Sequence, residues 1–242
     1  MGKRAVILGA LLALIATLLL VQPASAQEED PCAAPPPGAI VGTNGNDVLR
    51  GTPEADLIVA RDGNDVVLGR GGDDLVCGGL GNDTIITGDG NDQVAADDLG
   101  FFGDPNAPGG NDVIVSGGGN DEILAGPGND TVNGGAGDDN LALAQGNDTG
   151  IGGSGNDTVI GGFGTDNIVG GTGNDFLAGG FDSDLVNGGV GDDTLIGDIP
   201  GPPPTFLPPS PDPNPNVDTC IGAAGTDVAF LCESTIAVES VN

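Results

Sequence analysis

The chain has 242 residues, of which 47 are glycine, and 36 acidic residues against five Lys and Arg give a formal charge of −31. It contains no histidine, which excludes Ser-His-Asp triads, His-ligated zinc proteases and His-ligated haem. A chain this anionic repels phosphate, which disfavours nucleic-acid binding. Only 3% of the residues are aromatic, so a conventional mixed core is disfavoured. Two interpretations remain, a disordered acidic chain or a repeat fold whose turns need glycine.

Residues 1–26 have the features of a signal peptide. A short basic region precedes an apolar run from Ala5 to Val21, and Ala24-Ser25-Ala26 fits the small-residue cleavage pattern. A retained membrane anchor is the alternative, because the run is at the lower limit for a span. With cleavage the chain is secreted, carries a charge of −33 and does not span a membrane. The next segment, residues 27–41, is acidic and proline-rich and predicts an extended N-terminal arm.

Residues 42–197 consist of sixteen nine-residue repeats. In the type unit, Gly152 to Ile160, the sixth position is Asp, the fourth is Gly and the eighth is aliphatic. Glu54 and Asp182 replace the fourth Gly, and Gly150 breaks the aliphatic eighth position. Disorder would not maintain this register. The sixth-position residues are Asp47, Asp56, Asp65, Asp74, Asp83, Asp92, Asp112, Asp121, Asp130, Asp139, Asp148, Asp157, Asp166, Asp175, Asp184 and Asp193.

Each repeat predicts a turn followed by a short strand. The first six positions are rich in Gly, Asn and Asp, which tolerate the backbone conformations of tight turns. The last three are strand formers, and a three-residue strand cannot be stable alone. Stacking solves this if two repeats make one coil of 18 residues, strands pair in parallel between coils, and the eighth position faces inward. The sixteen repeats then give about eight coils and a stack about 38 Å long.

The repeated Asp is not explained by packing. Two columns of carboxylates would run along the two edges of the stack, where like charges repel strongly. A hard dication between successive turns removes this repulsion, and Ca²⁺ accepts six to eight oxygen ligands. Mg²⁺ demands stricter geometry, and transition metals are disfavoured because His and clustered Cys are absent.

The repeat G-G-x-G-x-D-x-U-x resembles the RTX, or haemolysin-type calcium-binding, nonapeptide repeat over roughly two thirds of the chain. The resemblance implies an all-β, right-handed parallel β-roll with calcium ions between consecutive turns. It further implies that the sixteen aspartates ligate calcium together with main-chain carbonyls of the glycine turns. The turns with Glu54 and Asp182 are doubtful sites. The carbonyl candidates are Gly78, Gly134, Gly152, Gly170 and Gly188.

Three segments interrupt or follow the repeats. Residues 96–106 are an insertion, either simply tolerated or a contact loop that uses Phe101 and Phe102. Residues 198–216 are proline-rich and predict a loop. Residues 217–242 predict a degenerate repeat and C-terminal cap, because Asp218 and Asp227 are again nine apart.

The four cysteines of an exported chain predict two disulfides, for which three connectivities exist. Cys220 and Cys232 are close in sequence and would join parts of the C-terminal cap. That pairing leaves Cys32 with Cys77, which would tie the N-terminal arm to the first coils.

One outward column of the stack is predicted to be entirely apolar if the insertion does not exchange the two sheets. Strand propensity is one explanation, and a partner or dimer face is the other. The column consists of Val59, Cys77, Ala95, Leu124, Ala142, Ile160, Ala178 and Ile196.

The sequence therefore predicts a secreted calcium-binding protein that folds on binding several Ca²⁺ ions and has a structural, adhesive or interaction role. A cell-envelope component or a second copy is the partner to test. A calcium-dependent polysaccharide-active enzyme is the alternative, but the carboxylates that it would need are those that bind calcium, so we expect no enzyme. An ice-binding solenoid is excluded because the seventh position lacks a regular Thr array.

Overall fold

The structure is a computed structural model that describes residues 31–97, 109–198, 219–222, 228–230, 232 and 234–236. The chain divides into two units, Met1–Pro36 and Pro37–Asn242. In the first, the described residues form a turn and a bend. The predicted signal peptide lies outside the described residues, as do both insertion phenylalanines and most of the proline-rich loop. Within the part that is described, no helix is long and apolar enough to cross a membrane.

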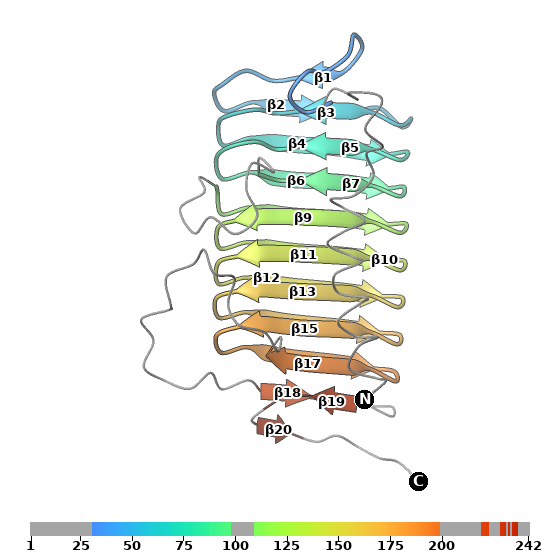
Figure 1. Cartoon of the computed structure of the whole chain (residues 1–242). Coiled ribbons are helices and arrows are strands. Elements are labelled where there is room, and N and C mark those ends of the chain that lie inside the picture. Colours follow the sequence, from blue (N-terminus) through green and yellow to red (C-terminus); the bar gives the residue numbers. More distant parts are fainter. Residues whose placement is uncertain are drawn as a thin grey trace, which may run out of the picture. The chain divides into compact units, whose positions relative to one another are not determined.

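The second unit consists of two parallel sheets, each with ten strands among the described residues (Figure 1). The strands of the first sheet are β1 (Ile40–Val41), β3 (Leu57–Val59), β5 (Leu75–Cys77), β7 (Gln93–Ala95), β9 (Glu122–Pro127), β11 (Asn140–Gln145), β13 (Thr158–Phe163), β15 (Phe176–Phe181), β17 (Thr194–Asp198) and β19 (Val228–Phe230). Those of the second are β2 (Val48–Arg50), β4 (Val66–Gly71), β6 (Thr84–Asp89), β8 (Val113–Gly118), β10 (Thr131–Ala136), β12 (Thr149–Ser154), β14 (Asn167–Thr172), β16 (Leu185–Val190), β18 (Thr219–Ile221) and β20 (Ser234–Ile236).

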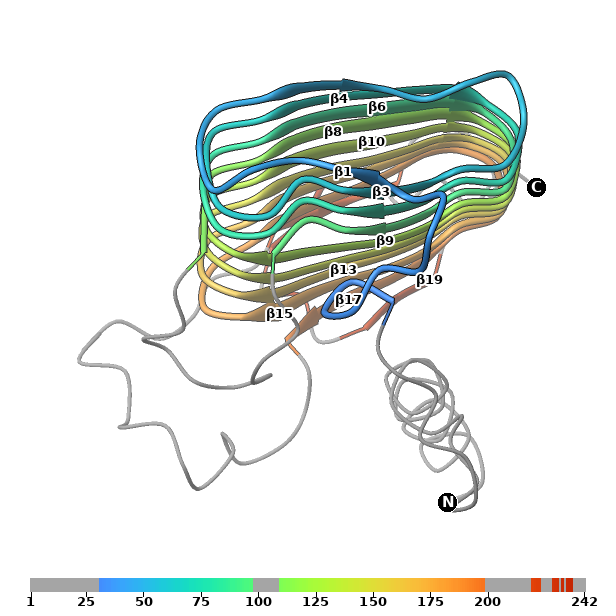
Figure 2. The same ribbon diagram turned by 90° about the horizontal axis from the view of Figure 1, so that it is seen from above.

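The chain alternates between the two sheets, so that each pair of strands completes one flattened coil (Figure 2). Strands pair with the strand one coil away at a displacement of 18 residues, as Leu141 does with Val159. Across the insertion the displacement is 29, and Ile85 pairs with Ile114 without any exchange of sheets. The predicted all-β stack of about eight coils is confirmed.

The interior strands are longer than the three residues that the sequence predicts. In β10 and β12 the pairing continues past the eighth and ninth positions, where Gly135 pairs with Gly153 and Ala136 with Ser154. Gly153 adopts a φ of 120°, a conformation that side-chain-bearing residues rarely adopt. The second-position glycine therefore bends the backbone into the turn while it still pairs with the neighbouring coil.

The core lies between the two sheets, where the eighth positions supply a row of mostly aliphatic side chains from each sheet, as predicted, and first-position residues such as Ala60 and Ala125 join them. Gly150 is the exception in this row, and Leu143 explains it. A Cβ atom on Gly150 would lie 2.9 Å from Leu143 Cδ1, and Leu143 is fully buried. The first-position leucine thus fills the space that the eighth-position side chain leaves, which preserves close packing.

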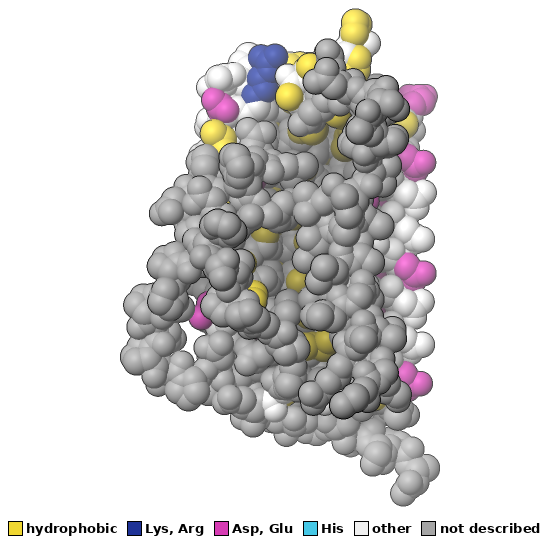
Figure 3. All heavy atoms as spheres, in the orientation of Figure 1, with side chains coloured by type: hydrophobic (Ala, Val, Ile, Leu, Met, Phe, Trp, Pro, Cys, Tyr) yellow, Lys and Arg dark blue, Asp and Glu magenta, His cyan; other side chains and the backbone are white. Residues whose placement is uncertain are grey.

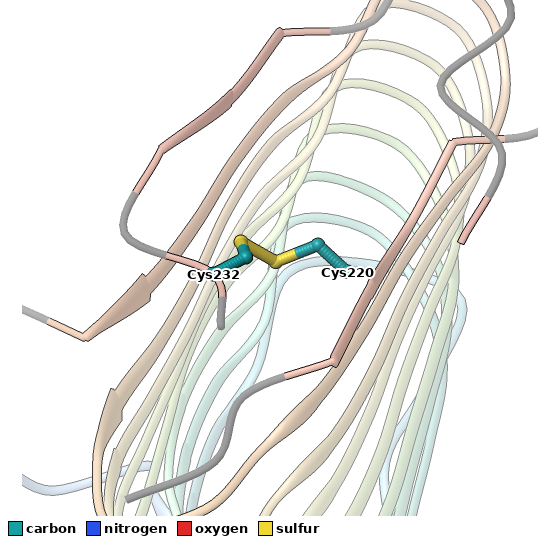
Figure 4. Close-up of a disulfide and its surroundings, with 2 residues drawn as sticks. All are labelled: Cys220 and Cys232. Atoms are coloured by element: carbon teal, nitrogen blue, oxygen red, sulfur yellow. A yellow bond between two sulfur atoms is a disulfide. The ribbon is translucent and has the colours of Figure 1, made fainter. Parts of the chain in front are cut away.

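At the C-terminal end, β18 and β19 add to the two sheets. Cys220 takes a core position and pairs with Val186 on the neighbouring strand of the same sheet. Cys220 forms a disulfide with Cys232, which follows β19, and the bond crosses the space between the sheets (Figure 4). Cys32 and Cys77 are also disulfide-bonded, and no cysteine of the described part is free. Both observations agree with the predicted pairing.

The predicted apolar column lies on the first sheet, where each residue pairs with the next. Six of its eight residues are buried, among them Leu124 and Ile160 at 5% and 7% exposure, although they lie outside the core row. On the second sheet, by contrast, Ile86 at the same position is 41% exposed. The column's role as a partner or dimer face stays a prediction.

Candidate metal-binding turns

The sixteen predicted aspartates lie in two columns, one at each edge of the coils. Along each column, Oδ1 of one Asp accepts a hydrogen bond from the main-chain N–H of the Asp one coil earlier. The N–H of Asp139 donates to Asp157 over 2.9 Å, and the N–H of Asp148 donates to Asp166 over 2.9 Å. From Asp65 onward each of these residues is at most 3% exposed. The carboxylates are thus fixed and shielded from water.

The second carboxylate oxygen, Oδ2, has no hydrogen-bond partner at twelve turns where it is also buried. These turns are those of Asp65, Asp74, Asp83, Asp92, Asp112, Asp121, Asp130, Asp139, Asp148, Asp157, Asp166 and Asp175. A buried charged oxygen without a partner is costly, because it has lost its water and gained nothing in return. A proton or a cation at each turn would remove this cost.

Burial raises the pKa of these carboxyls strongly. The pKa of Asp83 and of Asp130 rises to about 7, and that of Asp148 to about 8. Loss of water is the largest cause, the N–H of the preceding coil opposes it, and repulsion from stacked neighbours adds to the rise at Asp83 and Asp148. Without a metal ion, several of these carboxyls would therefore keep their protons close to neutral pH.

The first-position glycines show which oxygens meet between successive turns. A Cβ atom on Gly152 would lie 2.5 Å from Asp157 Oδ2 and 2.7 Å from the carbonyl oxygen of Gly170, one coil on. On Gly170 it would meet Asp175 Oδ2 and lie 2.5 Å from the Gly188 carbonyl oxygen. A carboxylate oxygen and a main-chain oxygen of neighbouring coils therefore lie close together beside the glycine, where a side chain would clash with both. This donor chemistry fits Ca²⁺.

The predicted carbonyl donors occupy these places. The carbonyl oxygens of Gly152, Gly170 and Gly188 each lie beside the first-position glycine of the preceding coil. Gly134 lies beside Asp139 Oδ2 in the same way, while its own carbonyl oxygen accepts a hydrogen bond of 2.6 Å from Ser116 Oγ. Beside Gly78 lie Asp83 Oδ2 and the carbonyl oxygen of Ala96. The ligand assignment itself stays a prediction.

The interior turns are not all alike, because six described turns carry a side chain at the first position. These residues are Ala60, Thr87, Ala96, Ser116, Ala125 and Leu143. The Thr87 hydroxyl donates to the carbonyl oxygen of Ser116 over 3.0 Å, and Ser116 in turn donates to Gly134. The oxygens of these turns therefore cannot be arranged as they are beside the glycines.

The first coil gives its carboxylates hydrogen-bond donors from threonine. Thr43 donates its N–H and its hydroxyl to Asp47 Oδ2 over 2.6 and 2.8 Å, and Thr52 does the same for Asp56 over 2.6 and 3.0 Å. These bonds, the N–H first, lower the pKa of Asp47. The turn in which Glu54 replaces the fourth-position glycine thus differs from the interior turns chiefly in the threonine at its second position. In the turn in which Asp182 replaces that glycine, Asp182 itself adopts a positive φ of 78°, as glycines at the fourth position do.

A second ladder at the fifth position escaped sequence reasoning. The side-chain oxygen of Asn64 accepts the main-chain N–H of Asn82 over 3.0 Å, and Asn129 accepts that of Asn147 over 2.8 Å. This ladder points toward the following coil, opposite in direction to that of the aspartates. The sequence signal for this ladder is the Asn that recurs at the fifth position. The hydrogen bonds of these residues hold successive turns in register.

Asp97 is a further buried acid, and it lies in the predicted insertion rather than at a sixth position. It is 4% exposed, its Oδ1 has no partner, and its Oδ2 accepts the N–H of Gly110 over 3.1 Å. Burial first, and then repulsion from Asp112, raise its pKa to about 8. Asp97 thus belongs to the same electrostatic system as the repeat carboxylates.

Positive side chains cannot neutralise these columns. No Lys, Arg or His occurs after Arg70, and Figure 3 shows the described basic side chains at the N-terminal end, with acidic ones spaced along one edge. Nor do three acidic or thiolate side chains converge anywhere in the described ranges. Main-chain oxygens must therefore supply most ligands of any ion, which again favours calcium over transition metals.

Comparison with known proteins agrees with this chemistry. The model of the RTX calcium-binding nonapeptide repeat family matches residues 41–76, 78–98, 109–141, 144–177 and 169–199, more than half of the chain. No curated protein matches the chain. The family match rests on the same repeats that form the two columns of carboxylates.

Proposed function

Because the chain belongs to the family of RTX calcium-binding nonapeptide repeat proteins, we propose that it is a secreted protein whose β-roll folds on binding several Ca²⁺ ions. In this proposal the folded roll serves a structural, adhesive or interaction role and carries out no catalysis. Calcium would supply the positive charge that the interior of each edge lacks. The ligands would be the aspartates from Asp65 to Asp193, together with carbonyl oxygens such as those of Gly152, Gly170 and Gly188.

The observation that carries this proposal is the unpartnered Oδ2 facing a carbonyl oxygen of the next coil, as at Asp157 and Gly170. The two oxygens belong to different coils, so the place exists only when the coils are stacked. Binding free energy therefore becomes folding free energy, as in other proteins whose unfolded chain has no preformed site. The high negative charge of the chain opposes folding until ions bind.

Secretion is supported by chemistry rather than by a direct observation. Disulfides persist in oxidising compartments, and all four cysteines are bonded. Residues 1–26 have the composition of a signal peptide. Extracellular calcium modules typically bind their ions at about 10⁻⁴ to 10⁻³ M, so calcium outside the cell would act as the trigger for folding.

Isothermal titration calorimetry of the mature chain, prepared free of metal with a chelator, tests the proposal. We expect several Ca²⁺ ions to bind per chain, with heat that includes folding, and Mg²⁺ at the same concentrations to give little or no heat. Equal binding of the two ions would contradict the assignment to calcium. No binding of either ion would contradict the proposed function altogether.

A further inference from the structure

We propose that Asp97 adds a side-chain carboxylate to the turn that contains the insertion, and that this turn and the next one form a calcium site unlike the others. The inference rests on the proposed function, since it assumes that the turns bind calcium. The inference goes beyond the proposed function because it assigns a ligand that lies outside the sixth-position columns and predicts which site binds calcium first.

The strand pairing places Asp97 at the second position of its turn. The N–H of Ala96 donates to the carbonyl oxygen of Leu124 over 2.9 Å, as the N–H of Gly78 does to Ala95 over 2.9 Å one coil earlier. Ala96 therefore takes the first position and Asp97 the second, and the turn resumes at Gly109. The other described second positions hold Thr, Arg, Gly or Ala, except for Asp198 at the end of β17, which pairs with Gly180. Asp97 is therefore the acidic second-position residue in the interior of the roll.

The carboxylate of Asp97 lies in the gap between two successive turns. A Cβ atom on Gly126, at the second position of the next coil, would lie 2.7 Å from Asp97 Cβ and 2.9 Å from its Oδ2. A Cβ atom on Gly109 would lie 2.5 Å from the same Oδ2 and would also meet the Pro127 carbonyl oxygen. A carboxylate oxygen and a main-chain oxygen of neighbouring coils thus converge here, as they do beside Gly152.

The hydrogen-bond donors around Asp97 compensate only part of the negative charge of its carboxylate. One N–H, that of Gly110, donates to Oδ2, and the buried Oδ1 has no partner. Asp112 and Asp130, which act on Asp97 by repulsion, also have a buried Oδ2 without a partner. No basic residue follows Arg70 in the sequence. A bound dication is the group that this chain can use to compensate the extra charge.

Two consequences follow from the extra carboxylate. The affinity of calcium sites rises with the number of charged ligands, so this site should bind the first ion. Asp97 and Gly110 also flank residues 98–108, so an ion held by Asp97 would fix the two ends of the inserted segment to the roll. The site would then set where ordered stacking of the coils begins.

Calcium titration of Asp97→Asn tests the inference, with Asp89→Asn as control, because Asp89 is exposed and its substitution removes the same charge. We expect the tightest calcium-binding step to weaken about tenfold or more in Asp97→Asn. The later steps should not change, and Asp89→Asn should bind like the parent protein. Asp97→Gly, which restores the residue that most turns carry at this position, should show the same loss.

The outcomes separate the two proposals. If the parent protein binds calcium and both Asp97 variants bind it with unchanged affinities and ion number, the inference is wrong and the proposed function stands. If the parent protein binds no calcium, the proposed function fails and the inference fails with it. If Asp97→Asn does not fold, the Asp97→Gly titration decides between a lost tight step and an unchanged one.

Discussion

The first coil and the interior coils satisfy the same aspartate in different ways. In the first coil, Thr43 and Thr52 donate two hydrogen bonds each to the Oδ2 of Asp47 and Asp56. In the interior, the second position is mostly glycine, and the corresponding oxygen of residues such as Asp157 is buried without a partner. The difference lies at the second position of the turn rather than at the aspartate.

This comparison teaches that the nine-residue register alone does not identify an ion site. A terminal coil has one face without a neighbour, so an ion there would be held from one side only. Hydroxyl and N–H donors contact the carboxylates in that coil, so we expect this end of the stack to need no metal. Interior coils have neighbours on both sides, and their carboxylates require compensation from outside the chain.

The largest effect that we expect is a reversal of the usual pH dependence in the absence of calcium. Asp83, Asp130 and Asp148 have a pKa of about 7 to 8 in the folded chain, against 3.8 for a free carboxyl. The folded state therefore binds more protons than the unfolded state between about pH 4 and 7, and its stability falls as pH rises. In chelator, far-UV circular dichroism should show more β-structure at pH 5 than at pH 8.

With saturating calcium the difference in β-structure between pH 5 and pH 8 should disappear or change sign. The ion replaces the protons at pH 8, and protons compete with the ion at pH 5. The expected difference between chelator and calcium is thus greatest at high pH. A chelated protein that is equally folded at both pH values would show that the interior carboxylates are compensated in some other way.

The next effect in size separates the two regions directly. Asp157→Asn removes an interior carboxylate whose Oδ2 faces the Gly170 carbonyl oxygen, so the protein should bind fewer calcium ions and need more calcium to fold. Asp56→Ala removes the acceptor of the Thr52 hydrogen bonds, so it should lower thermal stability at every calcium concentration without changing the ion number. Equilibrium dialysis with calcium analysis gives the ion number for each variant.

A smaller effect is expected from adding a side chain beside the carboxylate of a single turn. In Gly152→Ala the new Cβ would contact Asp157 Oδ2 and the Gly170 carbonyl oxygen, and such overpacking costs about 1–3 kcal/mol. Gly118→Ala is the matched control, because the nearest atom to its Cβ would be 3.5 Å away. Denaturant unfolding in saturating calcium should show a loss for Gly152→Ala alone, and equal stability of the two variants would contradict this close approach of the two oxygens to Gly152.

The smallest effect concerns the hydroxyl groups of the first coil. Thr52→Val keeps the main-chain hydrogen bond to Asp56 and removes the hydroxyl, which should cost about 1 kcal/mol. The loss should be the same at low and at saturating calcium in thermal unfolding experiments. If added calcium restored the stability of this variant, the first coil would be an ion site as well.

Much of the fold could be predicted from the sequence because the repeat length sets the register. The parallel pairing at 18 residues, the inward eighth position and the two columns of aspartates all follow from counting along the chain. The sequence also contained a sign of how the space at Gly150 is filled, because Leu143 is the one large apolar residue at a first position. Counting could not show that the Leu143 side chain occupies the space beside Gly150.

Other features of the site could be recognised only from the three-dimensional structure. Counting back from Asp112 gives the second position to residue 108, and only the hydrogen bonds of Ala96 show that Asp97 holds it. The threonine bonds depend on side-chain orientation, which no spacing rule predicts. The meeting of carboxylate and main-chain oxygens beside the glycines arises from the approach of two coils, which is a property of the stack and not of one repeat.

The most direct test of the account is far-UV circular dichroism of the mature protein at pH 8, first in chelator and then during calcium addition. We predict a spectrum without the β-sheet signal in chelator and cooperative appearance of that signal as calcium is added, with no comparable change on addition of magnesium. A full β-sheet spectrum in chelator at pH 8, unchanged by calcium, would contradict the claim that the interior carboxylates depend on the ion.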